Sequence, residues 1–369
     1  MSDAAASKKI PVTVLTGYLG AGKTTLLNRI LSENHGQKYA VIVNEFGEIG
    51  IDNDLIVGAD EEVFEMNNGC VCCTVRGDLV RIIDGLMKRK GKFVAFILET
   101  TGLADPAPVA QTFFVDEEVS QKTALDAVVT VADAKWLSER LKDAPEAKNQ
   151  IAFADVIVLN KTDLVNKDEL AEVEGRIRAI NPYATLHKTQ RCAVKLTDVL
   201  GRGAFDLDRI LELEPAFLEE DEHDHHHHHD HEHGPDCGCG EHGHDHDHHG
   251  HHHHGHGHGH HHGHGMKHYH DEDMQSLSLR SDKPLDPMKF MPWLQELVAN
   301  DGAKILRSKG ILAFAGDDDR YVFQGVHMML EGDHQRKWKP DEKRESRVVF
   351  IGRELPEERI REGFAKTIA

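Results

Sequence analysis

The chain has 369 residues, which is enough for two domains. Its formal net charge of −20 at pH 7 argues against a nucleic-acid partner, which would require a basic face. No apolar run approaches the roughly 18 residues of a membrane span, and residues 1–9 contain no hydrophobic region typical of a secretory signal. We therefore expect no membrane association and a cytoplasmic location.

The first feature along the chain is a phosphate-binding loop of the pattern G-x-x-x-x-G-K-[ST]. It follows a short apolar strand at 12–16 and precedes a segment with helical apolar spacing, which is the context that this motif requires. Backbone N–H groups of such a loop close around phosphate oxygens at a helix N-terminus. We expect Lys23 to neutralise the β- and γ-phosphates and the Thr24 hydroxyl to bind Mg²⁺. The expected nucleotide contacts in the loop are Gly17, Gly20, Ala21, Gly22, Lys23, Thr24 and Thr25.

A polar, glycine-bearing segment at 44–52 follows the next apolar strand. Its composition suits either a mobile first switch or an ordinary surface loop. Glu45 and Glu48 within it are possible ligands of a metal ion.

Three cysteines, Cys70, Cys72 and Cys73, occupy four consecutive positions. In a reducing compartment, clustered cysteines favour metal binding or catalysis over disulfides, and a disulfide between such close neighbours would be strained. Three thiolates suit Zn²⁺ or another soft or borderline ion and leave a fourth position open. We therefore predict the tightest metal site at this cluster.

The apolar strand at 93–98 ends in Glu99, and Gly102 follows three residues later. Glu99 is placed to hold a Mg²⁺-bound water. Gly102 could offer its N–H to the γ-phosphate and move after hydrolysis, as switch segments do. We expect both residues to take part in catalysis together with Lys23 and Thr24.

The buried-strand run at 156–159 leads into Asn160-Lys161-Thr162-Asp163, at the carboxyl end of a strand where α/β proteins bind ligands. The Asp163 carboxylate can accept two hydrogen bonds from guanine, whereas adenine offers neither donor. We therefore expect Asn160, Lys161 and Asp163 to select GTP.

Strand-like and helical patterns alternate through the first 200 residues, which predicts an α/β fold of the P-loop NTPase type with a mostly parallel sheet covered by helices. The segment 219–274 contains every histidine except His35, His187, His327 and His334. It cannot bury a core, so we expect a disordered linker whose imidazoles bind metal ions. The remaining residues indicate a small C-terminal α+β domain. The expected organisation is a flexible N-terminus at 1–9, a GTPase domain with the cysteine motif at 10–218, the linker at 219–274 and the C-terminal domain at 275–369.

The phosphate loop, the Cys-x-Cys-Cys motif and Asn-Lys-Thr-Asp, in this order, resemble the CobW family of P-loop GTPases. Residues 67–73 and 98–106 are most similar to its zinc-directed branch, which includes the zinc-regulated GTPase metalloprotein activators. The resemblance implies a GTPase that binds Zn²⁺ or Co²⁺ through the three cysteines and delivers it to a client metalloprotein. The eukaryotic activators carry a Cys-Pro segment near the N-terminus that engages their client. Residues 1–9 contain neither residue type, so the client does not carry over.

Two other functions remain open at this point: a metal buffer or sensor with a regulatory GTPase, and an accessory of cobalt insertion in cobalamin synthesis. The oligomeric state is also open.

Overall fold

The computed structural model describes residues 9–33, 38–44, 62–66, 74–88, 93–205, 274–340 and 342–369. All of these residues belong to one structural unit, which contains two β-sheets. Glu45, Glu48, the three clustered cysteines and the histidine tract lie outside the described residues.

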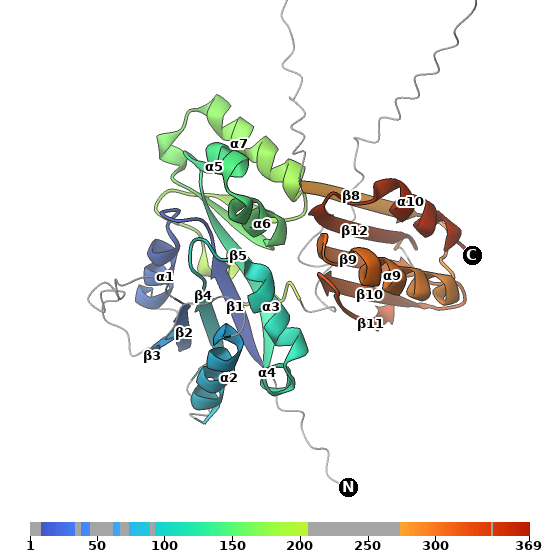
Figure 1. Ribbon diagram of the computed structural model, residues 1–369, viewed down its shortest axis with the longest axis horizontal. Helices are drawn as coiled ribbons and strands as arrows, with labels where there is room; N and C mark the ends of the chain where they lie inside the picture. The colour runs from blue at the N-terminus through green and yellow to red at the C-terminus, as the bar shows by residue number, and fades with distance from the viewer. Residues whose placement is uncertain are drawn as a thin grey trace, which may run out of the picture. The chain divides into compact units, whose positions relative to one another are not determined.

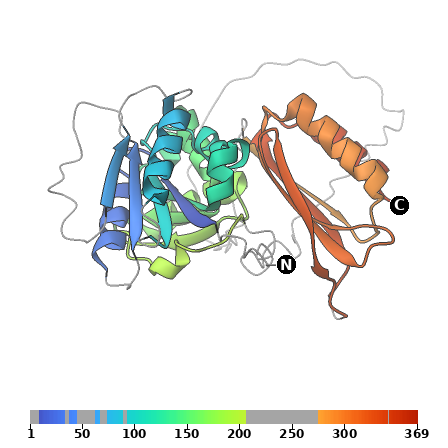
Figure 2. The same ribbon diagram turned by 90° about the horizontal axis from the view of Figure 1, so that it is seen from below.

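The first sheet has seven parallel strands in the order β3-β2-β4-β1-β5-β6-β7. Strands β1 to β5 of this sheet are labelled in Figure 1. Its central strands are almost completely buried, as expected where helices cover both faces of a parallel sheet (Figure 2). The predicted α/β fold class is confirmed. The strands are β1 (Ile10–Thr16), β2 (Tyr39–Asn44), β3 (Glu62–Met66), β4 (Ala95–Glu99), β5 (Thr123–Asp133), β6 (Val156–Asn160) and β7 (Thr185–Lys188).

The helices of this half begin at local capping signals. The Asp105 side chain accepts a hydrogen bond from the Ala107 N–H and Pro106 occupies the first turn of α3, while Asn166 and Glu169 form a reciprocal capping box at the start of α7. The helices are α1 (Lys23–Ser32), α2 (Thr74–Met87), α3 (Pro106–Val115), α4 (Glu117–Lys122), α5 (Leu137–Asp143), α6 (Pro145–Phe153) and α7 (Lys167–Ile180).

The strand register brings the predicted nucleotide motifs to one edge of the first sheet. Leu15 of β1 pairs with Glu99 of β4, and Asp133 of β5 pairs with Asn160 of β6. Because all strands run in the same direction, the loops that follow β1, β4, β5 and β6 leave from this carboxyl edge.

The second sheet is antiparallel, with the strand order β11-β10-β9-β12-β8. Helix α9 lies along one of its faces (Figure 2), and Phe290 of this helix packs among Phe314, Phe323 and Phe364 with ring centroids 6.0–6.4 Å apart. Its elements are β8 (Met274–Ser281), α9 (Pro287–Asp301), β9 (Ile305–Ala313), β10 (Asp319–Val326), β11 (Met329–Lys337), β12 (Ser346–Arg353) and α10 (Glu357–Lys366).

Strand β9 is buried along its whole length and connects the two halves of the unit. The Asp155 carboxylate accepts hydrogen bonds from the Val128 N–H at 2.8 Å and from the Arg307 and Lys309 side chains of β9. The Arg307 guanidinium also donates to the Phe153 carbonyl at 2.7 Å. Apolar residues of β9, β10 and β12 belong to the same hydrophobic cluster as the core of the first sheet.

Candidate functional site

The phosphate loop is closed by the side chain of its own lysine. Lys23 Nζ donates hydrogen bonds to the carbonyl oxygens of Gly17 at 2.8 Å and Tyr18 at 3.5 Å. Burial lowers the pKa of Lys23, and the nearby Glu99 carboxylate partly opposes this shift by favouring the charged form. The neighbouring hydroxyl-bearing residues Thr24 and Thr25 are exposed at the start of α1.

Two glycines of the loop are required by its geometry. Gly17 has φ +140°, and a Cβ there would lie 2.1 Å from the Val131 carbonyl oxygen. Gly22 has φ +117°, and a Cβ there would lie 2.6 Å from Asn160 Nδ2. Only glycine fits both positions, so the loop can approach the neighbouring strands closely enough to form a cradle of backbone N–H groups. This geometry fits a bound nucleotide phosphate.

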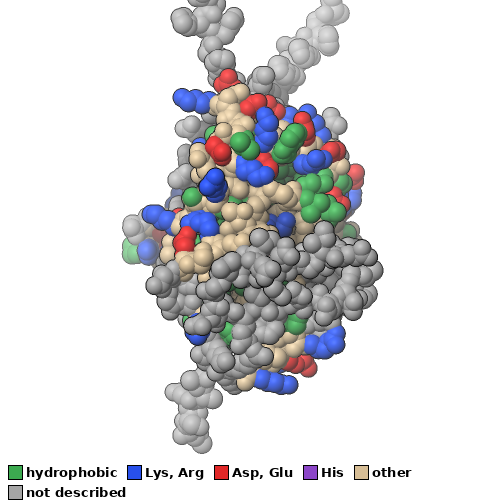
Figure 3. All heavy atoms as spheres, turned by 90° about the vertical axis from the view of Figure 1, so that its left-hand side faces the viewer, with side chains coloured by type: hydrophobic (Ala, Val, Ile, Leu, Met, Phe, Trp, Pro, Cys, Tyr) green, Lys and Arg blue, Asp and Glu red, His purple; other side chains and the backbone are tan. Residues whose placement is uncertain are grey.

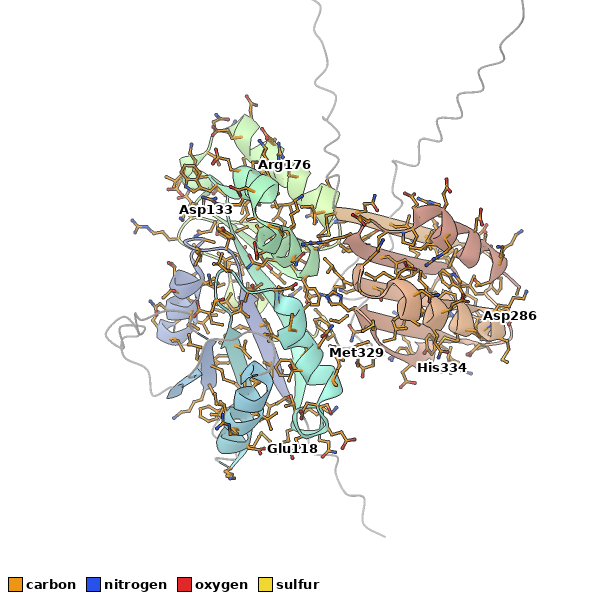
Figure 4. All side chains as sticks on the ribbon, in the orientation of Figure 1. Glu118, Asp133, Arg176, Asp286, Met329 and His334 are labelled. Carbon is orange, nitrogen blue, oxygen red and sulfur yellow. The ribbon has the colours of Figure 1, made fainter. Side chains whose placement is uncertain are left out.

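The predicted base-selecting motif is hydrogen-bonded to the phosphate loop. Asn160 Nδ2 donates to the Ala21 carbonyl at 3.0 Å, and Lys161 Nζ donates to the Gly20 carbonyl at 2.8 Å. Lys161 also forms an ion pair of 2.7 Å with Asp133, which stands at the carboxyl end of β5 (Figure 4). The structure therefore brings together the two motifs that the sequence predicted to bind one nucleotide.

Asp163 lies in a short 3-10 turn after β6, and its side chain is exposed to solvent. Lys161, immediately before this turn, has φ +60°. Asp163 is therefore accessible to a ligand at the same sheet edge as the phosphate loop.

Cys192 belongs to the same site, although no spacing pattern in the sequence points to it. Its N–H donates to Asn160 Oδ1 at 2.8 Å, its thiol lies 3.4 Å from the Gly22 carbonyl, and Arg29 donates to its carbonyl oxygen. Burial raises the pKa of this thiol to about 11. The thiol is therefore protonated at neutral pH and is a poor metal ligand there.

The predicted catalytic pair, Glu99 and Gly102, lies beside the loop. Glu99 is buried at the end of β4, and the Thr100 hydroxyl donates to the Thr16 hydroxyl at 2.9 Å. A Cβ on Gly102 would lie 2.6–2.8 Å from atoms of Leu19, so this segment packs directly on the phosphate loop. A shift of Leu19 therefore acts on Gly102 by direct contact.

A cavity of about 350 Å³ opens next to the phosphate loop. Tyr18 and Leu19 line it together with Trp136 of the loop before α5 and Gln150 of α6. Lys23, Thr24, Asn160 and Asp163 do not line it, so it is separate from the predicted nucleotide contacts.

The predicted metal ligands lie outside the described residues. Residue 67 follows the carboxyl end of β3, which is separated from β4 by β2 alone. Among the residues that the structure describes, no three His, Cys, Asp or Glu side chains are grouped to hold a metal ion.

Comparison with known proteins identifies the family. Residues 11–188 match the model described as the CobW/HypB/UreG nucleotide-binding domain, and residues 274–368 match the cobalamin synthesis protein cobW C-terminal domain. The zinc chaperone YjiA of Escherichia coli (strain K12) is 33% identical over 361 residues, which cover 96% of this chain and 98% of YjiA. The chain belongs to the CobW family.

Other CobW-family relatives support the same assignment. The zinc-regulated GTPase metalloprotein activator 1 of Dictyostelium discoideum is 39% identical over 250 residues, covering 58% of this chain and 52% of that protein. The crystal structure of Zn(II)-bound YjiA GTPase from E. coli matches with a TM-score of 0.71 and 30% identity, covering 98% of this chain and all of that chain. The family resemblance predicted from the motifs is confirmed.

Two further properties of the described residues concern their helices and their surface charges. None of its helices is both long and apolar enough to cross a membrane. On the face shown in Figure 3, basic and acidic side chains are interspersed over the described surface.

Proposed function

We propose that this CobW-family GTPase binds Zn²⁺, or Co²⁺, at Cys70, Cys72 and Cys73 and delivers it to a client metalloprotein under the control of GTP. The observation that carries the proposal is the shared sheet edge. Strand β3, which precedes the cysteine motif in the sequence, ends at the carboxyl edge that also carries the phosphate loop, Glu99 and the Asn-Lys-Thr-Asp motif. The names of the zinc chaperone and activator relatives agree with this assignment.

The described residues have separate roles in GTP hydrolysis. Lys23 supplies positive charge to the β- and γ-phosphates, and Asn160 and Lys161 hold the loop in shape. Mg²⁺ would be held by Thr24, with Glu99 orienting one of its waters, and would neutralise phosphate charge. Gly102 packs against Leu19 of the phosphate loop, so its position can change when a γ-phosphate is bound or lost.

Metal transfer requires a site that changes with the nucleotide. Strand β2 pairs with both β3 and β4, so the carboxyl ends of β3 and β4 are separated by one strand in the sheet. A rearrangement after β4 can therefore alter the geometry of three thiolates that follow β3. A cytoplasmic location suits this chemistry, because thiols stay reduced there.

Nucleotide and zinc affinities are expected to be coupled. The dissociation constant for Zn²⁺ should differ between the GTP-loaded and GDP-loaded protein by about 5–150-fold, the range of a coupling free energy of 1–3 kcal/mol. By linkage, Zn²⁺ should change GTP affinity by the same factor. Competition with a chelator of known affinity measures the dissociation constant for Zn²⁺ of the protein loaded with GDP or with a non-hydrolysable GTP analogue. Titration of the same analogue with and without Zn²⁺ measures the reciprocal effect. Equal zinc affinity in the two states would reduce the protein to a metal buffer with an unconnected GTPase.

Asp163→Ala is expected to weaken GTP binding at least about tenfold, because a hydrogen bond to a charged group contributes about 1.5–3 kcal/mol. ATP affinity, already low, should not fall further. Calorimetric titration of both nucleotides checks this, with Asp168→Ala, an exposed carboxylate in the first turn of α7, as the matched control. If the unmodified protein bound ATP as tightly as GTP, the guanine assignment would be wrong.

A further inference from the structure

Helix α6 carries two buried amide side chains that the predicted nucleotide motifs leave unexplained. The helix is buried from Ala147 to Phe153, and within it Asn149 is 9% exposed and Gln150 is 1% exposed. Buried amide side chains in folded proteins nearly always have hydrogen-bond partners. The partners of these two side chains indicate their purpose.

Gln150 holds the segment that contains the predicted catalytic glycine. Its Nε2 donates to the Gly102 and Ala104 carbonyl oxygens, each at 3.1 Å. Gly102 in turn packs against Leu19 of the phosphate loop. One buried side chain therefore fixes two carbonyls of the segment that follows Glu99.

Asn149 holds the other end of the same segment. Its Nδ2 donates to Asp105 Oδ2 at 2.9 Å, while Asp105 Oδ1 accepts the hydrogen bond that caps α3. Residues 102–105 are thus attached at both ends to consecutive residues of α6.

The C-terminal half of the unit reaches the same helix through Arg353, at the end of β12. Its Nη2 donates to Asn149 Oδ1 at 2.6 Å and to the Pro145 carbonyl at 3.3 Å. The Arg353 backbone N–H donates to the Lys304 carbonyl at 2.9 Å, which fixes it beside the start of β9. Asn149 consequently has one partner in the segment 102–105 and one in the C-terminal sheet.

We propose that Asn149 and Gln150 are positioning residues for GTP hydrolysis, and that Arg353 transmits the state of the C-terminal domain to them. The inference rests on the proposed role of Gly102. In this arrangement Gln150 sets where the Gly102 N–H stands relative to the phosphate loop, and Arg353 orients Asn149 against Asp105. A client that shifts β12 would thereby change the rate of hydrolysis.

The test measures steady-state GTP hydrolysis by the full chain. Asn149→Ala and Arg353→Ala should each lower kcat about three- to thirty-fold, the range expected for residues that couple without touching the ligand. KM for GTP and the affinity for GDP should stay within about twofold of the unmodified protein, because no nucleotide contact is removed. The double variant should be no slower than the slower single variant, since both break one chain of hydrogen bonds.

Lys304→Ala is the matched control. It removes an exposed side chain that pairs with Glu354 next to Arg353, but it leaves the contact with Asn149 intact. Its kcat should equal that of the unmodified protein.

A reciprocal exchange separates positioning from simple loss of folding. Asn149→Asp alone places two carboxylates in contact and should lower kcat more than Asn149→Ala does. Combining it with Asp105→Asn should restore kcat, because the amide at position 105 then donates to the carboxylate at position 149 and still accepts the cap of α3. Failure of this rescue in a protein that melts at the normal temperature would overturn the proposal.

Two further outcomes distinguish this inference from the function on which it rests. If Lys23→Ala is inactive but Arg353→Ala and Asn149→Ala hydrolyse GTP at the normal rate, the GTPase site stands and the link to the C-terminal domain is wrong. If Lys23→Ala retains normal turnover, the proposed site is wrong and the link falls with it.

Discussion

Lys23→Ala is expected to abolish GTP turnover. Lys23 Nζ is held at 2.8 Å from the Gly17 carbonyl and lies close enough to Glu99 for the two charges to interact. Phosphoryl transfer depends on positioning and electrostatic stabilisation, and this side chain is the cation that the phosphate-loop motif itself supplies. Removal of one preorganised electrostatic group typically lowers kcat about 10²–10³-fold. Phosphate release under single-turnover conditions measures the chemical step separately from nucleotide binding.

The control is Lys135→Ala, which removes an exposed lysine from the loop after β5 at the same sheet edge. Its turnover should equal that of the unmodified protein. A Lys23→Ala protein that hydrolyses GTP at the normal rate would show that the phosphate loop is not the catalytic site.

Simultaneous replacement of Cys70, Cys72 and Cys73 by serine is expected to eliminate the tightest zinc site. Thiolates bind Zn²⁺ at about 2.3 Å, and a serine hydroxyl does not lose its proton at neutral pH. The triple variant should lose one high-affinity equivalent and keep weaker sites from the histidines. Because binding requires deprotonated thiols, the affinity of the unmodified protein should fall as the pH drops.

Cys192→Ser provides the matched control for zinc binding. Burial raises the pKa of Cys192 to about 11, so its thiol stays protonated and does not compete for the metal. This variant should keep the high-affinity equivalent in a chelator competition. Persistence of that equivalent in the triple variant would place the tight site elsewhere.

The parts of the fold that sequence reasoning predicted are those with a local signal. The phosphate loop and Asn-Lys-Thr-Asp have fixed spacing, and the strands at β1, β4 and β6 are continuous apolar runs. The structure places both motifs at one sheet edge, in hydrogen-bonding contact. The individual roles of Glu99, Gly102 and the cysteines stay predictions, as do the domain limits.

Helix α6 has no clear local signal in the sequence, for a physical reason. It is buried from Ala147 to Phe153, so its sequence lacks the one-sided apolar period by which a surface helix is recognised. Strands β3 and β7 are only 5 and 4 residues long. Their positions in the sheet are set by pairing with β2 and β6, respectively.

The roles of Asp133 and Cys192 arise only from tertiary structure. Asp133 meets Lys161 because β5 and β6 pair in register, and Cys192 meets Asn160 across 32 positions of sequence. Arg336 and Lys337 end β11, and Arg336 is paired with Glu342.

The way Asp155 is bound limits how this protein can be dissected. A polypeptide ending before Met274 would lose Arg307 and Lys309, and of the three hydrogen-bond donors to the Asp155 carboxylate described above, the Val128 N–H alone would stay. The same truncation would uncover apolar side chains now packed against β9, and such surfaces promote aggregation. The nucleotide-binding half should therefore be insoluble or poorly folded when expressed alone, and biochemical work requires both halves in one polypeptide.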